Sequence, residues 1–244
     1  MKEGGKRGGE VAYVAGATGY TGREVVRILS EKGYRTIAHV RPDSCQFREW
    51  EARFEMMGAE VDGTAWEEQA MTETLGRVGP GAVFALLGTT RARAKDEGRS
   101  AVEGYEAVDY GLTALLRRAA EASGHGPRFV YLSSLGVTPK ARNPYLAVRA
   151  RIEGELRKGS LPYTVVRPAV ITGADRDEDR RGERIGAVAL DGVAGVLGAI
   201  GAKRLGKRLA TTTNTALAQE LVRLAFDPAA AGRIIESEDL EKGA

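Results

Sequence analysis

The sequence contains one cysteine, Cys45, and two histidines, His39 and His125. A single cysteine excludes an intramolecular disulfide, which is typical of a protein in a reducing compartment. The usual ligand spacing of zinc and iron–sulfur sites is missing, and neither histidine has a serine or cysteine partner that would indicate hydrolysis. We therefore expect neither a metal site nor a hydrolytic triad.

An excess of one charge is also missing. The chain has 36 lysines and arginines against 33 acidic residues, a net charge of +3, with both signs interspersed. Despite a sequence pI near 9.0, this balance gives no electrostatic basis for binding nucleic acid. The first ten residues are glycine-rich and charged and lack the apolar core of a secretion signal. We expect residues 1–10 to form a flexible tail, the protein to be cytoplasmic, and its partner to be a small molecule.

One stretch, residues 185–202 (IGAVALDGVAGVLGAIGA), is long enough to be considered as a membrane span. Its glycines and the charge of Asp191 at its middle weigh against insertion, because a buried charge is costly there. The KRLGKR sequence that follows favours either a membrane surface or the end of a helix. We expect an apolar helix pair packed over a pocket and no stable membrane insertion, with membrane association as a minor alternative.

Apolar runs and helical patterns alternate along most of the chain. Strands are predicted at 11–15, 36–40, 59–61, 81–88, 128–134 and 163–170, and helices at about 25–33, 46–57, 66–75, 99–123 and 145–158. Strands that are apolar throughout indicate a parallel sheet covered on both faces. The predicted fold class is therefore α/β, a Rossmann-like doubly wound sheet. No repeat or linker divides the chain, so 11–244 is expected to be one domain, with the less regular 174–210 as a small C-terminal substrate or cap region.

A glycine turn joins the first predicted strand to the first helix. Its spacing is G-x-x-G-x-x-G, which permits a tight turn, close approach of backbone to a pyrophosphate, and tight packing of helix on strand. Free N–H groups at the helix start would hold the phosphates. A plain strand-to-helix turn is the alternative, but the βα units that follow favour a dinucleotide site. The predicted binding residues are Gly16, Thr18, Gly19, Tyr20, Thr21 and Gly22.

The end of the second strand decides which dinucleotide is expected. An acidic residue about 20 positions after the glycines would bind the ribose hydroxyls of NAD. Here the sequence is His39-Val40-Arg41, and Asp43 comes only after a proline. Arg41 would instead bind a 2′-phosphate, with Ser44 as a second donor, unless it is a solvated arginine. We expect NADP(H) as the cofactor, in preference to NAD(H).

Four motifs, taken in order, resemble one family. They are GATGYTG at 16–22, LLGTTR at 86–91, YLSSLG at 131–136 and VVRPA at 165–169. Together they resemble the atypical short-chain dehydrogenases/reductases, and among these the NmrA-like branch around the Tat-interacting (CC3) oxidoreductase-like proteins. The resemblance covers about residues 11–175. It implies an NADP(H)-binding Rossmann fold with a small C-terminal substrate region.

The resemblance also implies roles for single residues. Asp62 would lie near the adenine, and Leu87, Gly88, Thr89 and Thr90 would line the cofactor. Ser133, Ser134 and Tyr145 match the family's active-site serine and tyrosine. Pro168, Ala169 and Val170 would face the nicotinamide, although the family usually has Pro-Gly there.

The family tyrosine is followed, four residues on, by a lysine, but this chain has Arg149 after Tyr145. Reduction of a carbonyl leaves an alkoxide that needs a proton, and a tyrosine with a pKa near 10 needs a neighbouring cation to supply it. Arginine keeps the charge, but it is a planar fork that does not give up a proton. The alternative is that Tyr145 starts a helix and Arg149 is solvated. We favour a functional pair, with Ser134 orienting the substrate oxygen.

Three functions are compatible with these residues. The leading one is an NADP(H)-dependent oxidoreductase acting on a small carbonyl, enone or alcohol. The others are a non-catalytic NADPH-sensing interaction protein and a lyase or isomerase using the same tyrosine. Weaker candidates are Arg91 and Arg93, which could meet an anionic substrate, and Asp109, for which a solvated or core-packing role suffices. The chain is expected to be a monomer or a homodimer.

Overall fold

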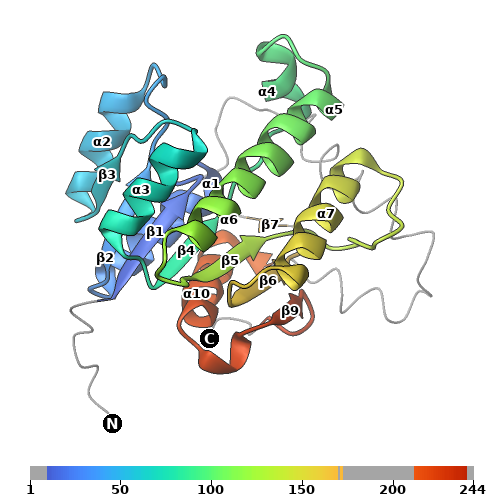
Figure 1. The fold of residues 1–244 in the computed structure, drawn as a ribbon. Coiled ribbons are helices and arrows are strands. Elements are labelled where there is room, and N and C mark those ends of the chain that lie inside the picture. Colours follow the sequence, from blue (N-terminus) through green and yellow to red (C-terminus); the bar gives the residue numbers. More distant parts are fainter. Residues whose placement is uncertain (1–9, 170, 173–211, 241–244) are drawn as a thin grey trace.

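The structure is a computed structural model. It describes residues 10–169, 171–172 and 212–240. Seven strands form one parallel sheet in the order β3-β2-β1-β4-β5-β6-β9 (Figure 1). The order runs outward from β1 in one direction and from β4 in the other, so the doubly wound prediction is confirmed. The strands are β1 (Val11–Ala15), β2 (Arg35–His39), β3 (Glu60–Asp62), β4 (Ala82–Ala85), β5 (Arg128–Leu132), β6 (Tyr163–Arg167) and β9 (Arg233–Glu236).

Helices cover both faces of this sheet (Figure 1). On one face lie α1 (Tyr20–Glu31) and α10 (Asn214–Ala225). The hydrophobic core on this face also includes Phe54 of α2 (Phe47–Met56). On the other lie α3 (Glu68–Val78), α6 (Thr113–Ala122) and α7 (Pro144–Lys158). The shorter elements are α4 (Arg91–Asp96), α5 (Ala101–Gly104), η1 (Tyr105–Leu112), η2 (Pro228–Ala230), and the two-stranded pair β7 (Ile171–Thr172) and β8 (Thr212–Thr213).

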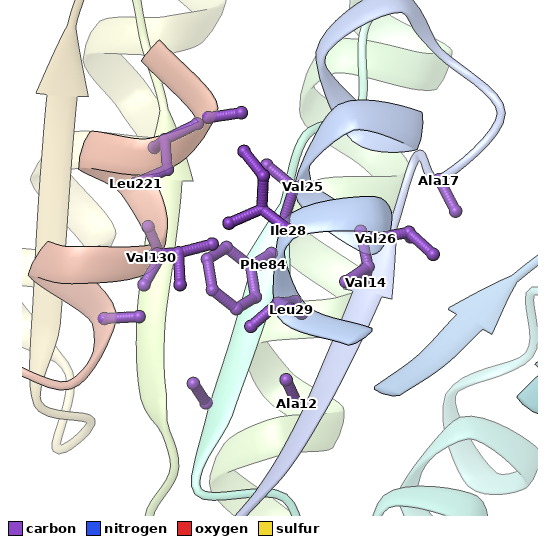
Figure 2. Packing of buried hydrophobic residues seen from close by; sticks show 14 of the residues in the cluster. Ala12, Val14, Ala17, Val25, Val26, Ile28, Leu29, Phe84, Val130 and Leu221 are labelled. Carbon is purple, nitrogen blue, oxygen red and sulfur yellow. The ribbon is translucent and has the colours of Figure 1, made fainter. Parts of the chain in front are cut away.

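Figure 2 shows the core on the face where α1 and α10 meet the sheet. Val25, Ile28 and Leu29 of α1 point toward Phe84 of β4, and all four are buried. The residues on either side of Phe84 belong to the hydrophobic cluster of the opposite face. Because β4 is buried on both sides, its sequence is apolar throughout instead of alternating.

The C-terminal part of the described chain adds a helix and a strand that the sequence analysis did not predict. Beyond the predicted cap we expected no particular helix or strand, but α10 packs on α1 and β9 adds the seventh strand, next to β6. Helix α10 buries Leu217, Leu221 and Leu224 against the sheet, a helical spacing that the sequence already contains. The predicted tail and cap (1–10 and 174–210) and Val170 fall outside the described residues, Glu10 excepted. Within the described part, no helix combines the length and apolar character needed to cross a membrane.

The long helix predicted at 99–123 is interrupted in its geometry. The run from Ala101 to Ala122 consists of α5, the π-helix η1 and α6, and it is preceded by the separate short helix α4. A π-helix places more residues in each turn than an α-helix and is frequent at functional sites. Here it carries Asp109, whose side chain is buried.

Candidate functional site

The glycine turn between β1 and α1 requires its glycines for separate reasons. Gly16 has φ +82°, and a Cβ there would lie 2.5 Å from the carbonyl oxygen of Leu86. A Cβ on Gly22 would collide with the carbonyl of Gly16. Gly19 is the N-cap residue of α1 and supplies no side-chain hydrogen bond to the first turn. The first-turn N–H groups therefore have no side-chain cap, which suits a phosphate.

A pocket of about 530 Å³ lies at the carboxyl ends of β1, β2 and β4. This is where the strand order reverses, the usual ligand position in doubly wound sheets. Of the predicted cofactor residues, eight line it: Gly16, Thr18, Gly19, Arg41, Ser44, Leu87, Gly88 and Thr89. Its described lining does not include Tyr20, Thr21, Gly22, Asp62, Thr90, Pro168 or Ala169.

Asp62 is held by residues outside the pocket lining. Its carboxylate accepts hydrogen bonds from the hydroxyls of Tyr13 (2.6 Å) and Thr64 (2.7 Å). The pocket wall nearby consists instead of His39 and Trp66, whose rings meet edge to face with centroids 4.6 Å apart. The Nε2 atom of His39 donates to the Thr64 carbonyl at 2.8 Å, and burial lowers the pKa of His39. This wall is therefore aromatic and uncharged at neutral pH.

The outer part of the pocket carries Arg41. Its side chain is 54% exposed and lies 3.8 Å from the carboxylate of Asp43, which also lines the pocket. An exposed ion pair at that distance contributes little, so Arg41 is available to another anion. The neighbouring Ser44 accepts a hydrogen bond from the backbone of Gln46, at the start of α2. Arg93 of α4 lines the same pocket.

The two serines that follow β5 have different environments. Ser133 is buried and donates a 2.7 Å hydrogen bond to Glu153 of α7. Glu153 also accepts two hydrogen bonds from Arg167, at 2.9 and 2.6 Å. Ser134 is partly exposed, and among the described residues its hydroxyl makes only a 3.4 Å contact with the carbonyl of Leu135. Ser134 is therefore the serine whose hydroxyl can serve a ligand.

Tyr145 stands at the start of α7. The side chain of Asn143 accepts a hydrogen bond from its backbone N–H at 2.9 Å, and so caps the helix. The partly exposed ring of Tyr145 packs edge to face on Tyr105, with centroids 5.4 Å apart. The guanidinium carbon of Arg149 lies 4.5 Å from the centre of the same ring. The structure thus brings the tyrosine and the cation together.

Arg149 is not a solvated cation, because its side chain is only 7% exposed. It donates to Asp109 at 2.9 Å and to the carbonyl of Leu132, at the end of β5, at 2.7 Å. Burial acts to lower the pKa of Arg149, but Tyr145, Tyr131 and Asp109 outweigh it and hold that pKa above its ordinary value. The guanidinium therefore stays charged inside the protein.

Asp109 is the residue that sequence reasoning underestimated. A solvated or core-packing role was the expectation, but its carboxylate is fully buried and pairs with Arg149. Its other oxygen accepts the backbone N–H of Thr89, in the pocket wall, at 2.9 Å. The available signal was an acid in the apolar run AVDYGL, since a buried charge requires a partner. Its partner stands 40 residues further along the chain.

A glycine turn next to a pocket, at the point where a parallel sheet reverses its strand order, is the arrangement with which Rossmann proteins bind dinucleotides. Residues 16–197 match a family described as NAD(P)H-binding, and the chain belongs to this family.

This chain is similar in sequence or in fold to several known proteins. It is 30% identical over 167 residues to the ceramide reductase of Caulobacter vibrioides, covering 67% of this chain and 47% of that protein, about half its length. It is 29% identical over 177 residues to the mitochondrial protein FMP52 of Eremothecium gossypii, covering 70% of each. The solved structure of UDP-glucose 4-epimerase from Brucella ovis in complex with NAD shares the fold. That comparison has a TM-score of 0.62 at 16% identity and covers 93% of this chain and 76% of the epimerase.

Proposed function

We propose that this protein is an NADP(H)-dependent oxidoreductase acting on a small carbonyl, enone or alcohol. The observation that carries the proposal is Tyr145 beside a buried, permanently charged Arg149, which is bonded through Asp109 to the wall of the dinucleotide pocket. A relative named ceramide reductase supports reductase chemistry as the reaction class. The likeness to the NmrA-like branch, which rests on the sequence motifs, supports the same cofactor.

NADP(H) is proposed over NAD(H) because of the charges at the end of β2. Arg41 is exposed at the pocket and only loosely paired, so its guanidinium can bind a 2′-phosphate. Ser44 lies beside it and offers a hydroxyl. Asp43, the acid that could bind a ribose instead, lies beyond the proline, within reach of Arg41.

In this proposal the chain's own residues move one proton. The bound dinucleotide supplies or accepts the hydride when it is present. Tyr145 gives its hydroxyl proton to the substrate oxygen, and the charge of Arg149 stabilises the phenolate that remains. Ser134 donates a hydrogen bond to the same oxygen and orients it. Ser133 takes no part, because its hydroxyl is bonded to Glu153.

A second candidate is a non-catalytic NADPH sensor. It is favoured by one observation: the guanidinium of Arg149 is already used by Asp109 and the Leu132 carbonyl, so it is less mobile than a lysine would be. A sensor would bind NADPH tightly, yet no carbonyl compound would oxidise it. An Arg149→Lys variant that gained activity would support this candidate.

The first test is calorimetric titration of the purified chain with NADPH and, separately, NADH. We expect NADPH to bind at least about tenfold more tightly, or about 1.4 kcal/mol. Binding of neither nucleotide would overturn the proposal. Once a substrate is found among small carbonyls, Tyr145→Phe should abolish most turnover while NADPH binding persists. Unchanged turnover in that variant would contradict the role of Tyr145.

A further inference from the structure

Asp109 connects two elements that are not adjacent in the sequence. Its Oδ2 accepts the backbone N–H of Thr89 at 2.9 Å, and its Oδ1 accepts Nη2 of Arg149 at 2.9 Å. Thr89 lies in the loop after β4, and Arg149 lies on α7. Because the carboxylate is fully buried, water does not replace either bond.

The loop backbone also packs directly on this ion pair. A Cβ added to Gly88 would lie 3.3 Å from Oδ1 of Asp109 and 3.4 Å from Nη2 of Arg149. Leu87, Gly88 and Thr89 all line the dinucleotide pocket. A shift of the pair would therefore displace this part of the pocket wall.

On the other side, the pair determines where the cation stands relative to Tyr145. Nη1 of Arg149 donates to the Leu132 carbonyl at 2.7 Å, and Nη2 is held by Asp109. These two bonds fix the plane of the guanidinium, whose carbon lies 4.5 Å from the centre of the Tyr145 ring. One carboxylate thus orients both the pocket wall and the cation beside the tyrosine.

We propose that Asp109 is a positioning residue that couples dinucleotide binding to the Tyr145 site. Through Thr89 it holds the loop in the conformation that receives the cofactor, and through Arg149 it places the charge beside the tyrosine. This inference rests on the proposed function. The inference predicts that substitutions can separate the effect of Asp109 on the loop, through Thr89, from its effect on the tyrosine, through Arg149.

Two double variants separate these two effects of Asp109 without leaving a buried charge unpaired. Asp109→Leu with Arg149→Met removes both charges and also the acceptor for the Thr89 N–H. Asp109→Asn with Arg149→Met removes both charges but keeps a side-chain oxygen for that N–H. The control is Arg117→Met, which breaks the ion pairs of Arg117 with Glu121 (2.6 Å) and Glu155 (3.3 Å). Arg117 is not among the described residues that line the pocket.

Amide hydrogen exchange at Thr89, without nucleotide, and the Kd for NADPH are the two readouts. The Leu–Met variant should exchange Thr89 faster and bind NADPH more weakly, each by about tenfold or more, because the N–H loses its acceptor. The Asn–Met variant should stay within about threefold of the wild-type chain in both. With a substrate at hand, both variants should lose turnover. Arg117→Met should lower Tm but change neither exchange at Thr89 nor NADPH affinity.

Wild-type exchange and affinity in the Leu–Met variant would overturn the inference and leave the pair with a purely structural role. If Asp109→Leu does not fit the fold, Asp109→Ala with Arg149→Met removes the same acceptor at smaller volume, with the same expected result. If the wild-type chain binds neither dinucleotide, the proposed function fails, but exchange at Thr89 still decides whether Asp109 holds the loop.

Discussion

Ser133 and Glu153 form a buried hydrogen bond of 2.7 Å between the end of β5 and the middle of α7. The same carboxylate binds Arg167, which also pairs with Glu236 of β9 at 2.7 Å. The bond therefore belongs to a network that joins α7 to the ends of β5, β6 and β9. Of the two adjacent serines, Ser133 is engaged in this network, and in the proposed function Ser134 orients the substrate.

Alanine substitution of each serine should give opposite results. Ser133→Ala should lower the free energy of unfolding by about 1–2 kcal/mol, because a buried carboxylate loses one donor. Ser134→Ala should leave that free energy nearly unchanged and lower kcat about tenfold or more, because the substrate oxygen loses its hydrogen bond. Urea unfolding and steady-state kinetics measure the two effects. A stable, inactive Ser133→Ala variant would contradict this division.

Removal of the Arg41 side chain should change which dinucleotide the protein prefers. Arg41→Ala should weaken NADPH binding about tenfold or more and leave NADH binding within about twofold, because only NADPH carries the 2′-phosphate. Arg35→Ala is the matched control. Arg35 starts β2, the strand that precedes Arg41, and pairs with Glu60 at 2.7 Å. Equal losses for both nucleotides in Arg41→Ala would show that Arg41 does not recognise the 2′-phosphate.

The glycine turn predicts a contrast between two Gly→Ala substitutions in helices. Gly22→Ala should lower the free energy of unfolding by about 1–3 kcal/mol, because its Cβ would press on the carbonyl of Gly16. Its NADPH affinity should fall as well, since the turn must shift. Gly154→Ala, in α7, has no atom within 4 Å of the new Cβ and should stabilise by about 0.5–1 kcal/mol. Thermal unfolding with and without NADPH measures both, and a stabilised Gly22→Ala would refute the packing argument.

Burial of His39 predicts a pH dependence of stability. Its pKa is lowered by burial, so the folded state keeps it neutral while the unfolded state binds a proton near pH 6.5. The stabilisation is therefore present above that pH and is lost as the pH falls below it, with a slope of up to about 1.4 kcal/mol per pH unit. His39→Gln keeps a donor for the Thr64 carbonyl and should flatten this slope. Urea midpoints between about pH 5 and pH 8 measure it.

The control for His39→Gln is His125→Gln, which removes the other histidine of the chain. His125 is exposed, and its Nε2 bonds the carbonyl of Gly76 on the surface. The slope should persist in this variant. A slope that disappears in His125→Gln and survives in His39→Gln would contradict the prediction, because the pH dependence would then come from His125.

Local sequence patterns predicted the elements that depend on nearby residues. The run from Val11 to Ala15, the three glycines of the turn and the apolar β4 each follow from the conformations allowed to a few consecutive residues. The doubly wound order followed because apolar strands alternating with helices have few ways to bury both faces. The exception was α10. Its apolar spacing is clear, but the sequence analysis predicted no helix or strand beyond the cap.

The sequence by itself determined that this chain is a Rossmann-like domain with a dinucleotide turn, since a turn and a periodicity are local properties of consecutive residues. Only the tertiary structure decided the partners of charged side chains. Arg149 meets Asp109 across 40 positions, and Ser133 meets Glu153 across 20, because η1 packs on α7 and α7 shares a hydrophobic core with β5. A buried charge must find an opposite charge in space, and chain folding, not sequence distance, determines which residue that is.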